Sequence, residues 1–504
     1  MGVARVASRA QLGLSAPRVE VEVHLGGGLP TFSIVGMPAT AVRESKDRVR
    51  AALATSGFEW PAGRITVNLS PADLPKEGCR YDLPIALGIL LASSQITVPE
   101  QRLANSEFYG ELGLAGELRP IRGVLLAAAH AAREQRSLVV PAANVSEARI
   151  ASPRIRGADS LLGVCALART GDTIELEPET PPAAVAGSGL DLVDVRGQAV
   201  PKRALIIAAA GGHSLLLVGP PGTGKTMLAQ RLPGLLPPLD ASEALDVAAI
   251  ASVSARGFAP EEFGRRPFRA PHHTASGGAI IGGGRGVRPG EVSLAHRGVL
   301  FLDELPEFNR TVLESLREPL ESGVVAVSRA ALQVEYPARF QLVAAMNPCP
   351  CGYLGEPTGN CRCAPPEIAR YRARISGPLL DRIDLRVTVP AVPSEELLDE
   401  DPAGAPRLTT DAAAAQVRAA REIQLRRAGK LNAELAGADL RRCCRLSREA
   451  RLLLAQLRAK FELSARGVHR VLRVARTIAD LHPDAPATLA PGHIAEALQL
   501  RRAI

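Results

Sequence analysis

Long apolar runs, aromatic side chains and cysteines are all scarce in this sequence of 504 residues. The most apolar stretch, residues 204–218, is interrupted by Gly211, Gly212 and His213, so we expect no membrane-spanning helix. The first residues, MGVARVASRAQLGL, lack the apolar core of a signal peptide, which predicts a cytoplasmic protein. Aromatic residues make up only 3%, which argues against a nucleic-acid groove lined with stacking rings. Eight cysteines are too few for a disulfide scaffold of this size.

Positive charge is concentrated near the C-terminus. The chain carries 60 Lys and Arg against 52 Asp and Glu, a net charge of +8. Residues 407–504 contain 19 basic and 9 acidic residues, a local excess of +10 that leaves −2 for the rest. Such a segment can contact nucleic-acid phosphates, and it is equally consistent with a solvated helical face.

Two polar stretches divide the chain into three expected domains. EPETPPAAVAGSGL (177–190) and PSEELLDEDPAGAP (393–406) show no apolar periodicity, so we expect both to be linkers. The expected domains are therefore 1–176, 191–392 and 407–504. Three domains suit this length, because one hydrophobic core seldom spans so many residues.

Hydrophobic periodicity predicts an α/β fold followed by a helical segment. Residues 1–176 mix strand-like and helix-like runs, which is an α/β pattern. In the second domain, short apolar segments at 214–218, 298–302 and 340–345 alternate with helical patterns, which predicts a parallel sheet covered on both faces. Residues 407–504 carry apolar residues at helical spacing, as in a small helical bundle.

A glycine-rich loop between an apolar strand and a helix predicts a nucleotide site. The loop has the pattern GxxxxGK[ST] and consists of Gly219, Pro220, Pro221, Gly222, Thr223, Gly224, Lys225 and Thr226. Glycines let successive N–H groups turn toward phosphate oxygens, and the following helix adds its N-terminal dipole. Lys225 is then expected at the β- and γ-phosphates of ATP and the Thr226 hydroxyl at Mg²⁺.

Polar residues also end the two later apolar strands. Asp303 and Glu304 follow the segment GVLFL, where the first carboxylate is expected to hold Mg²⁺ and the second to polarise the attacking water. Asn347 follows the segment FQLVAAM and suits water positioning beside the γ-phosphate. Asn347 is equally consistent with a turn residue before proline.

Three longer segments carry a family resemblance: PFRAPHHTASGGAIIGGG (267–284), RPGEVSLAHRGVLFLDELPEF (288–308) and SGPLLDRIDL (376–385). They resemble the magnesium-chelatase-like AAA+ ATPases, and more closely the ComM/YifB group of competence-associated bacterial proteins. The motifs occur in the family's order, and the likeness covers nearly the whole chain. The resemblance implies a ring of identical subunits, typically a hexamer, driven by ATP and Mg²⁺.

The same resemblance implies roles for individual residues. Asn347 corresponds to sensor 1, and Arg382 to an arginine finger that reaches the ATP of a neighbouring subunit. Without the family, Arg382 reads as a surface ion pair with Asp381 or Asp384. Sensor 2 is expected at Arg466 or Arg473, with Arg466 preferred. Both arginines lie on one expected helix, seven residues apart and hence on one face.

Two further patterns lie in the second domain. Residues 323–340 alternate apolar and polar around Arg329, which predicts a β-hairpin. The resemblance implies that such a hairpin points into the central pore, and a plain surface hairpin is equally consistent with the sequence. For His272 and His273, hydrogen bonds within a loop are favoured over a metal site, because adjacent loop residues seldom face one ion.

Four cysteines are grouped within fifteen residues: Cys349, Cys351, Cys361 and Cys363. Four thiolates suit tetrahedral Zn²⁺, and a Gly/Pro-rich loop without a core would gain order from the ion. Reduced cysteines without metal, or a redox pair, are the alternatives, and zinc is favoured over them. ComM-like proteins carry a similar quartet, so the resemblance supports the zinc hypothesis.

The first domain resembles the Lon-protease-like fold (ribosomal protein S5 domain 2) over residues 65–90 and 114–132. Lon-type proteolysis needs a serine after a turn like Lys76-Glu77-Gly78, and Arg80 lies near that position. A nucleophile and its activating base are both required for peptide cleavage. We therefore expect a non-proteolytic domain without ATP-dependent peptidase activity.

The resemblance to the ComM/YifB group implies a motor that acts on DNA, a branch-migration helicase in recombination or natural transformation, and this is the function that we favour. Two other functions stay open at this point. One is a chelatase-type motor that inserts Mg²⁺ into a porphyrin, and the other is an AAA+ protein-remodelling ATPase. The basic C-terminal segment suits contact with DNA phosphates. The cysteine quartet counts against the chelatase function because it is shared with ComM-like proteins, as the resemblance implies.

Overall fold

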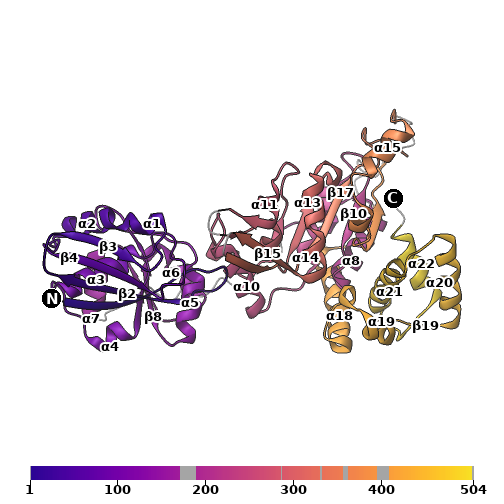
Figure 1. Cartoon of the computed structure of the whole chain (residues 1–504). Helices are drawn as coiled ribbons and strands as arrows, with labels where there is room; N and C mark the ends of the chain where they lie inside the picture. The colour runs from indigo at the N-terminus through magenta and orange to yellow at the C-terminus, as the bar shows by residue number, and fades with distance from the viewer. Residues whose placement is uncertain are drawn as a thin grey trace.

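The chain forms an elongated molecule with an N-terminal α/β domain, a central ATPase-like core and a C-terminal helical domain (Figure 1). The computed structural model describes residues 2–170, 189–284, 287–329, 332–355, 361–393 and 408–501. Most of each expected linker, at 177–190 and 393–406, lies outside the described residues. The α/β class, the parallel sheet of the core and the helical C-terminus are confirmed.

The described part of the N-terminal domain combines three sheets with helices, and the smallest sheet is the antiparallel pair of Glu111–Leu112 with Leu118–Arg119. Its four-stranded sheet has the order β1-β2-β4-β3, in which only β3 and β4 pair in parallel. A second sheet, β5-β8-β9, is parallel throughout. The strands are β1 (Gly2–Arg9), β2 (Arg18–Gly26), β3 (Thr31–Val35), β4 (Arg64–Ser70), β5 (Ser106–Phe108), β6 (Glu111–Leu112), β7 (Leu118–Arg119), β8 (Ser137–Pro141) and β9 (Ile155–Ala158). The helices are α1 (Thr40–Arg43), α2 (Ser45–Thr55), α3 (Asp82–Ala92), α4 (Glu100–Ala104), α5 (Val124–Arg133), α6 (Val145–Arg149) and α7 (Leu161–Thr170).

The central core is built on a five-stranded parallel sheet of order β11-β14-β17-β10-β18. Its strands are β10 (Leu215–Val218), β11 (Phe268–Arg269), β14 (Val299–Leu302), β17 (Gln341–Met346) and β18 (Leu385–Thr388). Two short antiparallel ribbons lie beside it, β12 (Gly282–Gly283) with β13 (Arg288–Pro289) and β15 (Val324–Arg329) with β16 (Leu332–Pro337). The helices are α8 (Ala199–Gly211), α9 (Lys225–Leu235), α10 (Ala241–Ser252), α11 (Gly277–Ile281), α12 (Glu291–Leu294), α13 (Arg310–Ser315), α14 (Arg317–Ser322), α15 (Pro365–Arg372) and α16 (Gly377–Leu380).

The expected hairpin around residue 329 is confirmed by the antiparallel pairing of β15 with β16. Residues 330 and 331, which connect the two strands, lie outside the described part of the chain.

The N-terminal domain meets the core on the side of α10. There the backbone N–H of Gly123 donates to the carbonyl of Ser252 at 3.1 Å. The apolar residues of α5 and α10 share one buried cluster, which fixes the contact between the two domains.

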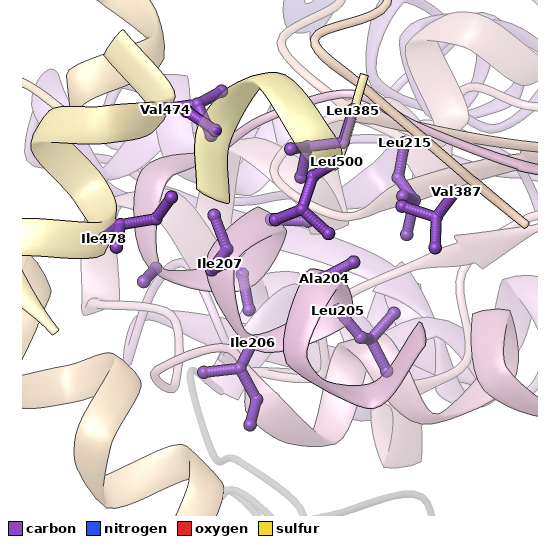
Figure 2. Packing of buried hydrophobic residues seen from close by; sticks show 14 of the residues in the cluster. Ala204, Leu205, Ile206, Ile207, Leu215, Leu385, Val387, Val474, Ile478 and Leu500 are labelled. Atoms are coloured by element: carbon purple, nitrogen blue, oxygen red, sulfur yellow. The ribbon is translucent and has the colours of Figure 1, made fainter. Parts of the chain in front are cut away.

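Helix α8 ties the core to the C-terminal domain. It is buried on nearly all sides, which is typical of a helix inside a hydrophobic core. Figure 2 shows Ala204, Leu205, Ile206 and Ile207 of α8 between the sheet residues and those of the C-terminal helices. Burying one such leucine or isoleucine contributes about 1.5–3 kcal/mol, so the two domains form one cooperative core.

Within residues 408–501, the C-terminal domain contains five α-helices and one short pair of parallel strands. The helices are α18 (Thr410–Ala428), α19 (Gly437–Cys443), α20 (Arg448–Lys460), α21 (Ala465–Asp480) and α22 (Pro491–Gln499), and the strands are β19 (Arg445–Leu446) and β20 (Thr488–Leu489).

The interior of the C-terminal domain holds a charged cluster around Asp480. The Asp480 carboxylate accepts bonds from Arg427 at 2.7 Å, from Asn432 at 2.8 Å and from Arg476 at 3.1 Å.

We expect the Asp480 cluster to be required for the stability of this domain. The Asp480 side chain is 0% exposed, so Asp480→Ala leaves the buried Arg476 and the partly buried Arg427 without their counter-charge. Removing one partner of a buried ion pair costs about 3–5 kcal/mol. Asp480→Ala should therefore lower the urea concentration at which the full chain unfolds, as followed by circular dichroism. The matched control is Asp484→Ala, because Asp484 is 86% exposed. Equal unfolding midpoints for the two variants would contradict the expectation.

Candidate nucleotide site

The residues predicted to bind nucleotide lie at the carboxyl edge of the parallel sheet. In the observed register, Val218 of β10 pairs with Met346 of β17, and Leu302 of β14 pairs with Ala344 of β17. The segments that follow these three strands begin at Gly219, Asp303 and Asn347. Because all three strands run in the same direction, these segments meet at one edge, which is the usual ligand position in an open α/β sheet.

The glycine-rich loop curls around the Lys225 amine. Gly222 and Gly224 adopt positive φ angles of 76° and 85°, which side chains disfavour. Lys225 Nζ donates to the Gly219 carbonyl at 2.7 Å and to the Asn347 Oδ1 atom at 3.2 Å. Burial lowers the pKa of Lys225, and the carboxylates of Asp303 and Glu304 oppose this effect. The predicted lysine and the predicted sensor amide are thus brought together by the fold.

Thr226 and Asp303 form a pair of oxygen ligands beside the loop. The Thr226 hydroxyl donates to Asp303 Oδ2 at 2.8 Å, and Asp303 Oδ1 accepts the backbone N–H of Glu304 at 2.9 Å. A hydroxyl and a carboxylate so close together can belong to the coordination or hydration shell of one Mg²⁺ ion, which prefers oxygen ligands. The donor chemistry therefore fits Mg²⁺.

Glu304 lies next to this pair in a strained conformation. Its φ of 50° is in the left-handed region, which costs about 1–3 kcal/mol for a residue with a side chain. Glu304 Oε2 pairs with His273 Nδ1 at 3.1 Å. His272 bonds to the hydroxyl of Thr274 at 2.8 Å, as favoured from the sequence. The contact between His273 and Glu304 was missed by sequence reasoning. A usable signal was that the histidines lie three and four residues after the end of β11, whose carboxyl end lies at the same edge.

The predicted arginines lie at the opposite, amino edge of the sheet. A cavity of about 1240 Å³ is lined by Ser214, which directly precedes β10, and by Arg382, Arg466 and Arg473. Residues 219–226, all of which the structure describes, do not line this cavity. A strand of four residues spans about 13 Å, so the fold separates Arg382 from the phosphate-binding loop of its own chain.

Arg382 is held in place by neighbours that the sequence did not indicate. Its guanidinium pairs with Glu321, and not with Asp381 or Asp384. Its carbonyl accepts the Ser214 hydroxyl at 2.7 Å. Asp384 is itself fixed by Arg470 at 2.7 Å and by His213. Burial opposes ionisation of Asp384, but these two neighbours hold its pKa well below the usual range.

Arg466 and Arg473 extend from α21 into the same cavity, in line with the predicted shared helix face. Arg466 is exposed, whereas the Arg473 Nε atom is buried without a hydrogen-bond partner among the described residues. Burial lowers the pKa of Arg473, and Asp384 opposes the shift. Arg466 and Arg473 line the same cavity as Arg382, so their positions favour neither one as sensor 2.

The four clustered cysteines converge on one point. Their sulfur atoms lie within 4.8 Å of one another, with Cys349 Sγ 3.3 Å from Cys351 Sγ and 3.7 Å from Cys361 Sγ. A tetrahedral zinc ion with bonds of about 2.3 Å places its sulfur ligands about 3.8 Å apart. The backbone N–H groups of Tyr353 and Arg362 face Cys351 and lower the pKa of its thiol to about 6. The neighbouring thiols instead raise the pKa of Cys361 and of Cys363, so the sulfur geometry rather than thiol acidity supports the metal. The donor set therefore fits Zn²⁺.

Comparison with known proteins places this geometry in a family. Residues 191–397 match the family described as magnesium chelatase, subunit ChlI, residues 21–144 match subunit ChlI of Mg-chelatase, and residues 407–501 match the ChlI C-terminal family. Competence protein ComM of Haemophilus influenzae is 48% identical over 507 aligned residues, covering 99% of this chain and 98% of the relative. The chain belongs to the ComM/YifB family of magnesium-chelatase-like AAA+ proteins.

Other relatives define how far the likeness extends. The protein named YifB of Escherichia coli is 46% identical to this ComM/YifB-family chain, in an alignment that covers 99% of this chain and 97% of the relative. The magnesium-chelatase 67 kDa subunit of Heliobacterium mobile is 29% identical and covers 33% of this chain and 29% of its own length. The AAA+ family implies ATP and Mg²⁺ as ligands, which agrees with the donors at the carboxyl edge.

In the N-terminal domain of this ComM/YifB-family chain, Lys76 and Arg80, at the turn where a Lon-type protease needs its serine, both make structural contacts. The Lys76 amine is buried and donates to the Pro71 carbonyl, and burial lowers its pKa. Arg80 bonds to the Tyr109 hydroxyl and to Gln11. The Lon-like fold and the lack of peptidase activity stay predictions, and casein cleavage with ATP is the assay that tests the second.

Within the described residues, no helix has the length and apolarity needed to cross a bilayer.

We expect Lys225 and Glu304 to separate ATP binding from hydrolysis. Lys225→Ala removes the cation of the loop and should weaken both. Glu304→Gln keeps the shape of the site but removes the base, so hydrolysis should fall by about 10²- to 10⁴-fold while ATP still binds. Binding of a fluorescent ATP analogue and release of phosphate measure the two steps.

Glu307→Gln is the matched control for this pair. Glu307 is a nearby acid that pairs with Arg374 at 2.8 Å and should keep wild-type hydrolysis when neutralised. Wild-type hydrolysis by Glu304→Gln would exclude Glu304 as the base.

Proposed function

We propose that this chain is an ATP-hydrolysing ring motor that moves DNA strands, as a branch-migration helicase in recombination or natural transformation. The observation that carries the ring is the placement of Arg382 at the sheet edge opposite the phosphate-binding loop. A chain whose arginine lies on the far side of its own nucleotide site needs a second copy to complete that site. Repeating such a head-to-tail contact closes a ring, typically of six subunits.

The residues of one active site would then come from two subunits. One subunit supplies the glycine-rich loop, Asp303, Glu304 and Asn347. Its neighbour supplies Arg382, together with Arg466 or Arg473 from the same cavity. Mg²⁺ held by Thr226 and Asp303 would neutralise phosphate charge. Glu304 would accept a proton from the attacking water, and the guanidinium groups would stabilise charge in the transition state. Hydrolysis therefore depends on assembly.

Support for DNA comes from charge and from kinship. The C-terminal residues 407–504 carry a local excess of +10, which suits contact with phosphates. A relative that is aligned over almost the whole chain is named as a competence protein. The competing chelatase function has support from the three matching families, which are described by a magnesium-chelatase subunit, and from a relative aligned with 33% of this chain. A protein-remodelling ATPase is the third candidate.

The DNA hypothesis predicts stimulation of ATP hydrolysis by nucleic acid. Phosphate release should rise with single-stranded, forked or four-way-junction DNA, and the stimulation should fade as salt increases because phosphate contacts release counterions. Lys225→Ala serves as the blank, and strand displacement on a labelled junction is the second readout. Hydrolysis that depends on Lys225 but ignores every DNA would exclude the helicase and favour a protein or porphyrin partner.

Mixing two inactive variants tests whether Arg382 acts on a neighbour. Arg382→Ala alone should lower turnover by about 10³-fold, as for other arginine fingers. A mixture of Arg382→Ala with Lys225→Ala forms some interfaces with an intact loop facing an intact arginine. With random assembly, roughly a quarter of the interfaces are of this kind, so activity should recover to a comparable fraction.

Arg374→Ala is the control for losing a surface arginine, because Arg374 is 53% exposed and pairs with Glu307. It should keep full activity. Failure of the mixture to recover, or full activity of Arg382→Ala alone, would contradict a role in trans.

A further inference from the structure

The cysteine quartet begins two residues after the sensor amide of the nucleotide site. Asn347 accepts a bond from Lys225 at 3.2 Å, and Cys349 follows in a fully buried position. The segment between them is held by α15, where Arg372 donates to the Pro348 carbonyl at 3.3 Å. The backbone N–H of Asn347 also faces the Tyr371 side chain, where it opposes the rise that burial causes in the pKa of the tyrosine. A shift of the quartet would therefore be transmitted to Asn347.

A second contact joins the quartet to the phosphate-binding loop directly. Gly352 is buried, has a φ of +89° and donates its N–H to the Cys349 carbonyl at 3.0 Å. A Cβ atom placed on Gly352 would lie 2.7 Å from Pro221 Cδ and 3.8 Å from Asn347 Cγ. The backbone of the quartet loop is thus packed against two elements of the nucleotide site, at a distance that only glycine permits.

We propose that zinc held by the four cysteines fixes one wall of the nucleotide site, so that zinc occupancy sets how well the chain binds and hydrolyses ATP. The ion joins Cys349 and Cys351 to Cys361 and Cys363, and Gly352 lies between these pairs. Without the ion, the loop gains conformational freedom and no longer holds Pro221 and Asn347 in position. Even a misplacement of about 1 Å in a site that positions reacting groups lowers its rate by about 10²-fold.

This inference rests on the ATP-binding part of the proposed function and is independent of DNA. Its test compares two alanine substitutions in the same loop. Gly352 and Gly355 have similar φ angles of +89° and +83°, so alanine strains the backbone equally at both. Only at Gly352 does the new methyl group meet the nucleotide site, because a Cβ on Gly355 has nothing within 4 Å among the described residues.

We expect both variants to retain about one zinc ion per chain, measured by plasma mass spectrometry. Gly352→Ala should weaken binding of a fluorescent ATP analogue and lower turnover by about tenfold or more, whereas Gly355→Ala should stay within about twofold of wild type. Equal behaviour of the two variants would overturn the coupling between the loop and the site.

The metal itself is tested on the full chain and with Cys361→Ser. Zinc removal by a chelator should weaken binding of the ATP analogue, and added zinc should restore it in wild type but not in Cys361→Ser. Circular dichroism follows whether the chain stays folded, and the glycine pair decides the question if it does not. A wild-type chain that contains no zinc, or a zinc-free chain with unchanged affinity, would overturn the proposal. If wild type fails to bind the ATP analogue at all, the proposed function fails instead.

Discussion

Parallel pairing of β10 with both β17 and β18 is the constraint on which the site depends. Because every strand of the central sheet runs the same way, the chain leaves each strand at one edge and enters at the other. The phosphate-binding loop, Asp303 and Asn347 follow the carboxyl ends of their strands. Arg382 instead lies on the segment that precedes the amino end of β18. One backbone rule thus separates the phosphate-binding loop from Arg382 within a single chain. In the proposed ring, a second copy would bring such an arginine to the loop.

The C-terminal domain packs against the amino edge of the sheet, on the same side as Arg382. Helix α8 buries its apolar residues against the sheet and against α21 at once (Figure 2). Beside this core, His213 bonds to the Thr477 hydroxyl at 2.8 Å and faces Asp384, which Arg470 also contacts. Such buried polar groups are costly unless each is satisfied, so the network specifies one orientation of the helical domain. That orientation brings Arg466 and Arg473 to Arg382.

Much of the central domain could be predicted because its signals are local. Strands expected at 214–218, 298–302 and 340–345 are observed as Leu215–Val218, Val299–Leu302 and Gln341–Met346. Short apolar runs bounded by polar residues identify buried strands without knowledge of their neighbours. Contacts between distant segments carry no such signal. The pairing of Arg382 with Glu321 and of Glu304 with His273, and the packing of Gly352 on Pro221, became evident from the structure alone.

The sequence by itself determined the chemistry that each segment offers. A glycine-rich loop, two carboxylates after an apolar strand, four grouped thiols and a set of arginines on one helix can all be read from residue type and spacing, because local backbone geometry links them. Only the tertiary structure decided which of these groups act together. Sheet order and strand direction place Gly352 of the cysteine-containing loop against Pro221 and place the arginines at the opposite edge. Such long-range packing depends on the whole buried core rather than on any one segment.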